Sequence, residues 1–353
     1  MARIDSLLQS LVELGGSDLH LSAGAPPIFR VNGLLQRTRH PSLEPDDIQD
    51  LVYEILSEEE IEQLESRKDL DFGYGVEGLA RFRANAYSHR KGVGATFRWI
   101  PASPPTIESL GLPPVVEQLA LEQRRLVVVT GPTGSGKTTT LAAMIHRRNL
   151  ERTDHVITLE DPLEFIHDDV KCLIHQRQVG RHAASFAAGL RAALREDPNV
   201  LLVGEMRDLE SVSLALTAAE TGLLVLGTLH TQSAAKTVDR IIDVFPADQQ
   251  SQVRSMLAES LRGVVAQVLL RRADGRGRVA ALEILINTPA VGHLIREAKT
   301  FQIPSVIQTG RKEGMQLLDQ CLMQLVSTQV IAPDEALRHA HNKSLFERLG
   351  KPG

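Results

Sequence analysis

The sequence has little cysteine, no surplus of positive charge and no long apolar run. Its 353 residues include two cysteines, Cys172 and Cys321, which lie far apart. Two isolated cysteines form neither a disulfide framework nor a zinc site, and they are typical of a reducing cytosol. No apolar stretch approaches the roughly 20 residues that cross a bilayer, and the amino terminus lacks the basic start and unbroken apolar core of a secretory signal. We therefore expect a soluble cytoplasmic protein that contacts a membrane only through a partner.

Acidic residues outnumber basic ones, 44 Asp and Glu against 39 Lys and Arg, which gives a formal charge of −5. Proteins whose main task is to coat nucleic acid usually have a basic balance, so we expect no nucleic-acid partner. Hydrophobic residues make up 42% of the chain, enough to form ordinary cores. At about 150 residues per domain, the length predicts two domains or three.

The first 100 residues mix short helices and strands. Apolar residues between Ile4 and Leu14 share one helix face, and Asn32-Gly33 predicts a hairpin turn. Helical periodicity extends over residues 45–65, and alternation over 79–100 predicts paired strands. Residues 101–114 then contain five prolines. Because proline fixes φ and donates no hydrogen bond, this segment predicts a linker.

From about residue 115, short apolar segments alternate with longer helical ones. Five strands are expected, at residues 125–130, 155–160, 199–205, 223–230 and 278–286. Such alternation predicts βαβ units and an α/β fold whose sheet is mainly parallel and buried on both faces. Beyond about residue 289 the pattern is helical. We therefore expect domains at 1–100, 115–289 and 290–353, with the linker at 101–114.

The most specific motif occupies residues 131–138, GPTGSGKT, and matches G-x-x-x-x-G-K-[ST] in full. An apolar strand precedes it and a helix-forming run follows it. Glycines allow backbone N–H groups to turn toward phosphate oxygens, and the following helix presents its positive end to the same anion. Lys137 is expected to reach the β- and γ-phosphates and Thr138 to bind Mg²⁺. The expected nucleotide-binding residues are Gly131, Pro132, Thr133, Gly134, Ser135, Gly136, Lys137, Thr138 and Thr139.

Acidic residues and a histidine follow three of the predicted strands. Glu160 ends the second strand and Asp161 and Glu164 follow it, while Glu205 ends the third strand and His230 ends the fourth. In open parallel sheets, ligands bind beyond the carboxyl ends of the strands. A nucleotide hydrolase needs one carboxylate on the Mg²⁺ side and another to orient and deprotonate water. The sequence favours Glu205 for the metal and Glu164 for the water, and it leaves the reverse assignment open.

Phosphoryl transfer also gains from an arginine that neutralises developing charge, often supplied by a neighbouring chain. Arg81 and Arg83 are candidates because alternation places them on the same face of one predicted strand. Arg195 and Arg207 are candidates in the second domain.

Four further segments carry a family resemblance, in addition to residues 17–33. They are GPTGSGKTTTLAAM (131–144), ITLEDPLEF (157–165), LREDPNVLLVGEMRD (194–208) and LTAAETGLLVLGTLHTQSAAKTVDRIIDVFP (216–246). Together they resemble the secretion-superfamily ATPases, and most of all the type IV pilus retraction motors.

The resemblance implies a PAS-like α/β amino-terminal domain, a RecA-like P-loop core and carboxy-terminal helices. It further implies a ring of six subunits that hydrolyses ATP with Mg²⁺ and acts on a platform protein of the inner membrane. Lys137 and Thr138 then belong to the Walker A motif, Glu205 is the Walker B glutamate and His230 belongs to the histidine box. Asp161 and Glu164 fall in the aspartate box, and Arg81 and Arg83 match arginines that approach a neighbour's nucleotide.

Four alternatives stay open at this point. The retraction motors commonly differ from this chain at residues 291–293, 223 and 178, which leaves room for an accessory retraction paralogue, working beside a second retraction ATPase. A pilus-extension or type II secretion ATPase is disfavoured because those ATPases are longer chains and often contain a four-cysteine zinc module, whereas this sequence has two cysteines. A DNA translocase is disfavoured by the acidic balance of the chain. A binding module that hydrolyses nothing is disfavoured by the complete set of acids, which includes Glu164 and Glu205.

Overall fold

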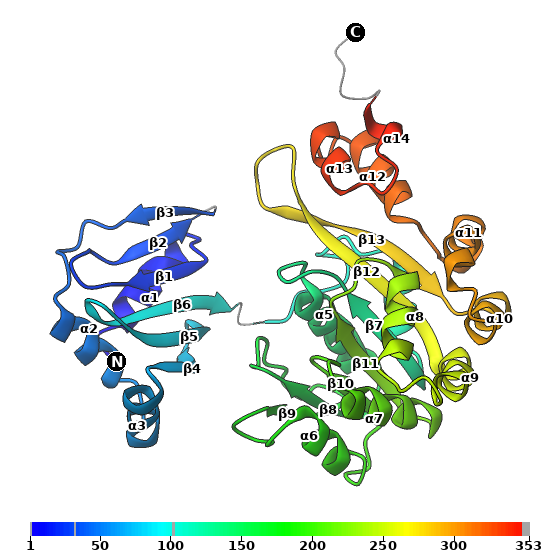
Figure 1. The fold of residues 1–353 in the computed structure, drawn as a ribbon. Helices are drawn as coiled ribbons and strands as arrows, with labels where there is room; N and C mark the ends of the chain where they lie inside the picture. Colours follow the sequence, from blue (N-terminus) through cyan, green and yellow to red (C-terminus); the bar gives the residue numbers. More distant parts are fainter. Residues whose placement is uncertain (1, 32, 101–102, 348–353) are drawn as a thin grey trace. The chain divides into compact units, whose positions relative to one another are not determined.

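A computed structural model describes residues 2–31, 33–100 and 103–347 (Figure 1). The chain divides into two compact units. The first comprises Met1–Ser103 together with the short segment Pro162–Ile166, and the second comprises Pro104–Asp161 and His167–Gly353. The predicted four-part division is finer than this and stays a prediction. Within the described ranges, no helix is both long and apolar enough to cross a membrane.

The first unit consists of a six-stranded antiparallel sheet and three helices. The sheet order is β3-β2-β1-β6-β5-β4. Leucines and phenylalanines from one face of the sheet form a single buried cluster with α1 and α2. The elements are α1 (Asp5–Glu13), β1 (Asp18–Leu21), β2 (Ile28–Val31), β3 (Leu34–Arg37), α2 (Pro45–Tyr53), α3 (Glu58–Arg67), β4 (Asp69–Val76), β5 (Ala80–His89) and β6 (Gly92–Ile100).

The sequence-based expectations for this unit are mostly confirmed. The hairpin β2–β3 is present, with Val31 opposite Leu34, although Asn32 of the predicted turn lies outside the described residues. The helical periodicity over 45–65 is confirmed, and the structure divides this stretch into two helices, α2 and α3. Ser57 begins α3 and accepts a hydrogen bond from the Glu60 backbone N–H, while the Glu60 carboxylate accepts one from the Ser57 N–H. This capping box starts a new helix within the periodic stretch.

The second unit is built on a seven-stranded sheet with the order β13-β12-β7-β11-β10-β8-β9. Every neighbouring pair is parallel except β12 and β13, which are antiparallel. Figure 1 shows α5 on one side of the strands and α8 and α9 on the other. The strands are β7 (Arg125–Thr130), β8 (His155–Glu160), β9 (Leu173–Gln178), β10 (Val200–Val203), β11 (Leu224–Leu229), β12 (Leu261–Arg271) and β13 (Arg278–Ile286).

All five strands predicted for this unit are present, and three of them have the predicted bounds. The strands that sequence reasoning missed are β9 and β12. The first helices of the unit are α4 (Pro114–Ala120), α5 (Lys137–Glu151), α6 (Phe186–Ala193), α7 (Leu209–Glu220), α8 (Ala234–Asp243) and α9 (Gln250–Ser260).

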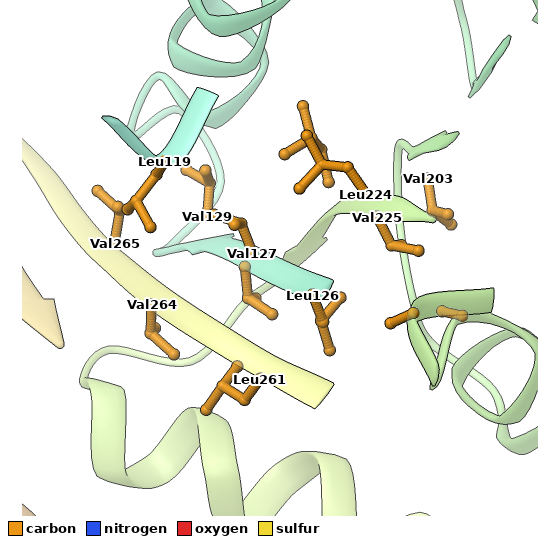
Figure 2. Close-up of a cluster of buried hydrophobic side chains, with 14 of the residues drawn as sticks. Leu119, Leu126, Val127, Val129, Val203, Leu224, Val225, Leu261, Val264 and Val265 are labelled. Carbon is orange, nitrogen blue, oxygen red and sulfur yellow. The ribbon is translucent and has the colours of Figure 1, made fainter. Parts of the chain in front are cut away.

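The core of the second unit surrounds β7, the strand that leads to the phosphate loop. Figure 2 shows side chains of β7, β11 and β12 packed together, with Leu126, Val127 and Val129 at the centre. These three residues are at most 1% exposed. Burying one such side chain stabilises a fold by about 1.5–3 kcal/mol. The loop therefore emerges from a strand that is buried in the core of the sheet.

The predicted helical carboxy-terminal region is also present. Part of it forms a separate buried cluster with Leu270 of β12 and Ala281 of β13. Its helices are α10 (Pro289–Arg296), η1 (Thr300–Gln302), α11 (Ile303–Thr309), η2 (Arg311–Glu313), α12 (Leu318–Ser327), α13 (Pro333–His339) and α14 (Ser344–Glu347). The β12–β13 ribbon thus links these helices to the sheet.

Candidate nucleotide-binding site

The predicted phosphate loop connects the end of β7 to the start of α5. Three of its glycines have positive φ: 146° at Gly131, 79° at Gly134 and 87° at Gly136. L-residues with a side chain rarely adopt such angles. A Cβ at Gly131 would lie 2.2 Å from the carbonyl oxygen of Gln267, which is backbone and cannot move aside. Glycine is therefore required there by both conformation and space.

Gln267 of β12 holds this loop from below. Its side chain is 2% exposed. Its Nε2 donates to the carbonyl oxygen of Ser135 at 2.6 Å, and its Oε1 accepts from Thr140 Oγ1 at 2.9 Å. One amide group therefore joins the loop to the first turn of α5. Sequence reasoning missed this residue because it missed β12; a glutamine within an apolar run is the signal that could have drawn attention to it.

The residues that would face a phosphate group fit that ligand. Lys137 Nζ donates to the carbonyl oxygens of Gly131 at 2.9 Å and Pro132 at 3.2 Å, so its ammonium lies over the loop. Ser135 Oγ is buried and has no hydrogen-bond partner among the described residues. The positive amino-terminal end of α5 begins at Lys137. Thr138 is half-buried in the same helical turn.

Glu205 and His230 are brought together at the carboxyl edge of the sheet. They follow β10 and β11, which are parallel neighbours. Glu205 Oε1 and His230 Nε2 share a hydrogen bond of 2.5 Å, and Arg207 Nε pairs with the same carboxylate oxygen. The hydrogen bond between Arg207 and Glu205 raises the pKa of the Arg207 guanidinium above its ordinary value. The Glu205 carboxylate is therefore held in position by two neighbours, of which Arg207 carries a positive charge.

A chain of hydroxyl groups connects the phosphate loop to the segment after His230. Thr130, the last residue of β7, is fully buried. Its Oγ1 donates to the carbonyl oxygen of Thr231 at 2.8 Å and lies 2.8 Å from Thr231 Oγ1. Thr231 Oγ1 in turn lies 2.7 Å from Thr237 Oγ1 in α8. We define residues His230–Ser233 as the histidine loop, which these contacts fix against the start of the phosphate loop.

Glu160, the last residue of β8, and the two acids that follow it have different surroundings. Glu160 is 7% exposed and accepts from Thr158 Oγ1 at 2.7 Å. Asp161 is exposed, and its charge contributes to the raised pKa of Arg207. Glu164 is half-buried in Pro162–Ile166, the segment that groups with the first unit. The predicted role of Glu164 in activating water stays a prediction.

The four candidate arginines lie in different places. Arg81 and Arg83 occur two residues apart on β5, opposite Ile100 and Arg98 of β6, and so share one face as predicted. Arg195 is exposed just after α6. Arg207 pairs directly with Glu205, a candidate catalytic acid.

The second unit places several groups at one sheet edge that suit a nucleotide and a divalent cation. Among the described residues, no three His, Cys, Asp or Glu side chains cluster as a metal site. A divalent cation would therefore depend on few protein ligands, such as the Thr138 hydroxyl and the Glu205 carboxylate, together with phosphate oxygens. This is how Mg²⁺ is commonly held in nucleotide sites.

The family model for "Type II/IV secretion system protein" matches residues 1–347. The chain belongs to this family. The retraction ATPase PilT of Pseudomonas aeruginosa, described as "Type IV pilus retractation ATPase PilT", is 51% identical over 337 residues. That alignment covers 96% of this chain and 98% of the relative.

Two further members of the secretion family are closely similar. The "Type IV pilus ATPase PilU" of Pseudomonas aeruginosa is 40% identical over 349 residues, 99% of this chain and 91% of its own. The solved structure titled "Crystal Structure of the Pilus Retraction Motor PilT and Bound ADP" is 44% identical, with a TM-score of 0.91 and coverage of 99% of both chains. The match to this structure confirms the expected RecA-like core, preceded by an amino-terminal domain and followed by helices.

Proposed function

We propose that this chain is an ATPase motor that drives the retraction of type IV pili. The main support is the complete phosphate loop at residues 131–138. It occurs in a chain that aligns over nearly its whole length, at 51% identity, with a relative named as a retraction ATPase. The similar structure with bound ADP supports nucleotide binding at this loop. The lower identity to the PilU relative favours the main motor over an accessory retraction ATPase.

The phosphate loop binds the nucleotide in this proposal. Lys137 gives up its bonds to the carbonyls of Gly131 and Pro132 and pairs with phosphate oxygens instead. Backbone N–H groups of the loop and of the first turn of α5 donate to the same anion. The buried Ser135 hydroxyl acquires an acceptor. Because the loop is already fixed by Gln267, little ordering is needed on binding.

The acids at the sheet edge carry the chemistry. The Thr138 hydroxyl and the Glu205 carboxylate would hold Mg²⁺, which would neutralise phosphate charge when it is bound. Glu205 is oriented by His230 and Arg207, so its carboxylate keeps a fixed direction. Glu164 is the counterpart that would orient and deprotonate the attacking water. The assignment of these two glutamates can also be reversed.

Arg81 and Arg83 would complete the site of a neighbouring subunit. This requires a ring, for which six copies are expected from the family resemblance. Rotation of the first unit about the proline-rich segment 101–114 would then convert nucleotide contacts into mechanical work. The work would be delivered to an inner-membrane platform protein, so that the motor lies at the cytoplasmic membrane face without a nucleic-acid partner. A second retraction ATPase can share this task.

The proposal is tested by ATP turnover and by pilus behaviour in the same strain. Lys137→Ala removes the ammonium from the phosphates, and we expect turnover to fall at least about 100-fold with the fold unchanged. Cells with this variant should carry excess, immobile pili. Lys312→Ala, an exposed lysine on η2, is the matched control and should leave turnover intact. Undiminished turnover in Lys137→Ala would refute the site, and a loss of pili would indicate extension instead of retraction.

A further inference from the structure

A buried carboxylate on β13 has no part in the reaction proposed above. Glu283 is 4% exposed within the apolar core of the second unit. Burial raises its pKa, and the neighbouring backbone amides oppose that shift. A buried ionisable group is costly unless its oxygens are satisfied, so its contacts indicate what it holds in place.

One contact joins Glu283 to the histidine loop. Its Oε1 accepts the backbone N–H of Ala234 at 2.8 Å. Ala234 is the first residue of α8 and follows directly on the histidine loop, with Ser233 as the N-cap. The first N–H groups of a helix have no partner within the helix and favour a negative group. Glu283 therefore fixes the point at which the loop becomes a helix.

The same carboxylate also lies within electrostatic reach of the carboxy-terminal helices. The backbone amide of Leu318, which begins α12, and the charge of His341 both lower the pKa of Glu283, and the Asp319 carboxylate raises it. Asp319 in turn accepts the backbone N–H groups of His341 and Asn342, each at 2.9 Å. Glu283 thus binds the start of α8 and lies within electrostatic reach of the start of α12, two helices that are far apart in the sequence.

The strand around Glu283 is tied to the segment that leads into α12. Ile284 and Gln316 exchange backbone hydrogen bonds of 2.8 and 3.1 Å, and Gln316 Nε2 donates to the carbonyl oxygen of Leu282. On the other side, the histidine loop is bonded to Thr130 at the start of the phosphate loop. A continuous set of contacts therefore extends from the phosphate loop to α12.

We propose that Glu283 is a positioning residue that couples the histidine loop to the carboxy-terminal helices α12–α14. A shift of His230 that follows nucleotide binding moves the first turn of α8. Glu283 passes this shift along β13, because the next residue, Ile284, is bonded to Gln316 on the segment that leads into α12. This inference rests on the proposed ATPase function, to which it adds the route by which the site reaches a distant surface. A helix cap with only a structural role would give the same static contacts, so the test measures a response.

The first measurement uses the unmodified chain. Amide hydrogen exchange over residues 234–243 and 318–342 is compared without nucleotide, with ADP and with a non-hydrolysable ATP analogue, each with Mg²⁺. We expect exchange in both segments to change with nucleotide, together with protection of residues 131–140. Protection at 131–140 without any change at 318–342 would overturn the inference while leaving the proposed function in place. An absence of protection at 131–140 would count against the proposed function itself.

The second measurement uses Glu283→Gln, which keeps the size of the side chain. The amide can still accept from Ala234, but it carries no negative charge, so its electrostatic attraction for the start of α12 is lost. We expect the nucleotide response at 318–342 to be lost, and kcat to fall about fivefold or more, the usual size of an allosteric coupling. The KM for ATP should stay within about twofold, because the loop itself is unchanged.

Ser185→Ala provides a matched control for the loss of a helix cap. Ser185 caps α6 through the Ala188 N–H at 3.1 Å, away from α8 and α12. It should reduce stability while keeping both kcat and the response at 318–342. If Glu283→Gln behaves like Ser185→Ala in these two readouts, Glu283 is only a structural cap and the inference is wrong.

Discussion

Replacing Gln267 with methionine removes two hydrogen bonds beneath the phosphate loop and keeps a side chain of similar length. The bonds lost are those to the carbonyl of Ser135, at 2.6 Å, and from the hydroxyl of Thr140, at 2.9 Å. The Ser135 carbonyl then lies buried without a donor. Thr140 can rotate its hydroxyl toward another acceptor, so its loss is smaller.

The size of the effect follows from these two bonds. A buried carbonyl left without a donor costs about 1–3 kcal/mol, and the bond from Thr140 contributes about 1 kcal/mol. We therefore expect Gln267→Met to lower the free energy of unfolding of the second unit by about 2–4 kcal/mol. Since about 1.4 kcal/mol corresponds to a tenfold change in affinity, even part of this loss should raise the KM for ATP about tenfold. Gln267 touches the loop and not the reacting atoms, so kcat should change little.

Unfolding and turnover measured on the same preparations check this prediction. The unfolding transition that ADP shifts reports the second unit, and Thr140→Val should lower its stability by only about 1 kcal/mol. The double variant should lose less than the sum of the two single variants, because both remove the same contact. Unchanged stability and KM in Gln267→Met would refute the view that this side chain holds the loop.

Two pH-dependent predictions concern other buried groups. Burial lowers the pKa of His167 to about 4. Between about pH 6.5 and pH 4, therefore, the unfolded chain binds this proton and the folded chain does not. The free energy of unfolding should then fall by about 2–3 kcal/mol as the pH decreases through this range. His167→Gln should remove this loss in thermal unfolding at about pH 7 and pH 5; the same slope in both proteins would contradict it. Burial alone would raise the pKa of Asp18, but hydrogen bonds from Ser17 and Arg98 lower it, so its stabilisation is present above about pH 4 and lost as pH falls through the depressed pKa. Arg98→Gln should cost about 1 kcal/mol near neutral pH and make acid unfolding, reported by the single tryptophan, Trp99, begin at higher pH; an unchanged onset would argue against the pairing.

Buried strands and the phosphate loop could be predicted from local sequence, because each has a pattern that is complete within a few residues. The bounds of β7 and β8 match because both are buried apolar runs that end at polar residues. The strand β12 was missed for two physical reasons. Gly263 and Gln267 interrupt its apolar run, and no turn residue separates it from α9, which ends at Ser260. Breaks of this kind are resolved by packing rather than by local preference.

The parts of the site that could not be predicted depend on register between distant segments. Gln267 lies beneath the phosphate loop because β12 pairs with β7 in one particular alignment, with Ala266 opposite Thr130. The contact of Glu205 with His230 was within reach of the sequence, since both end neighbouring strands. The pairing of Arg207 with Glu205 was not, because it depends on the path of the chain after β10 and not on strand order.

The junction of α9 and β12 has no connecting loop. The helix ends at Ser260 and the strand begins at Leu261, whereas most such connections contain several residues that absorb small displacements. A shift of α9 along its axis therefore displaces the start of β12 as well. A displacement of α9 would therefore be transmitted directly through β12 to Gln267, which contacts the phosphate loop.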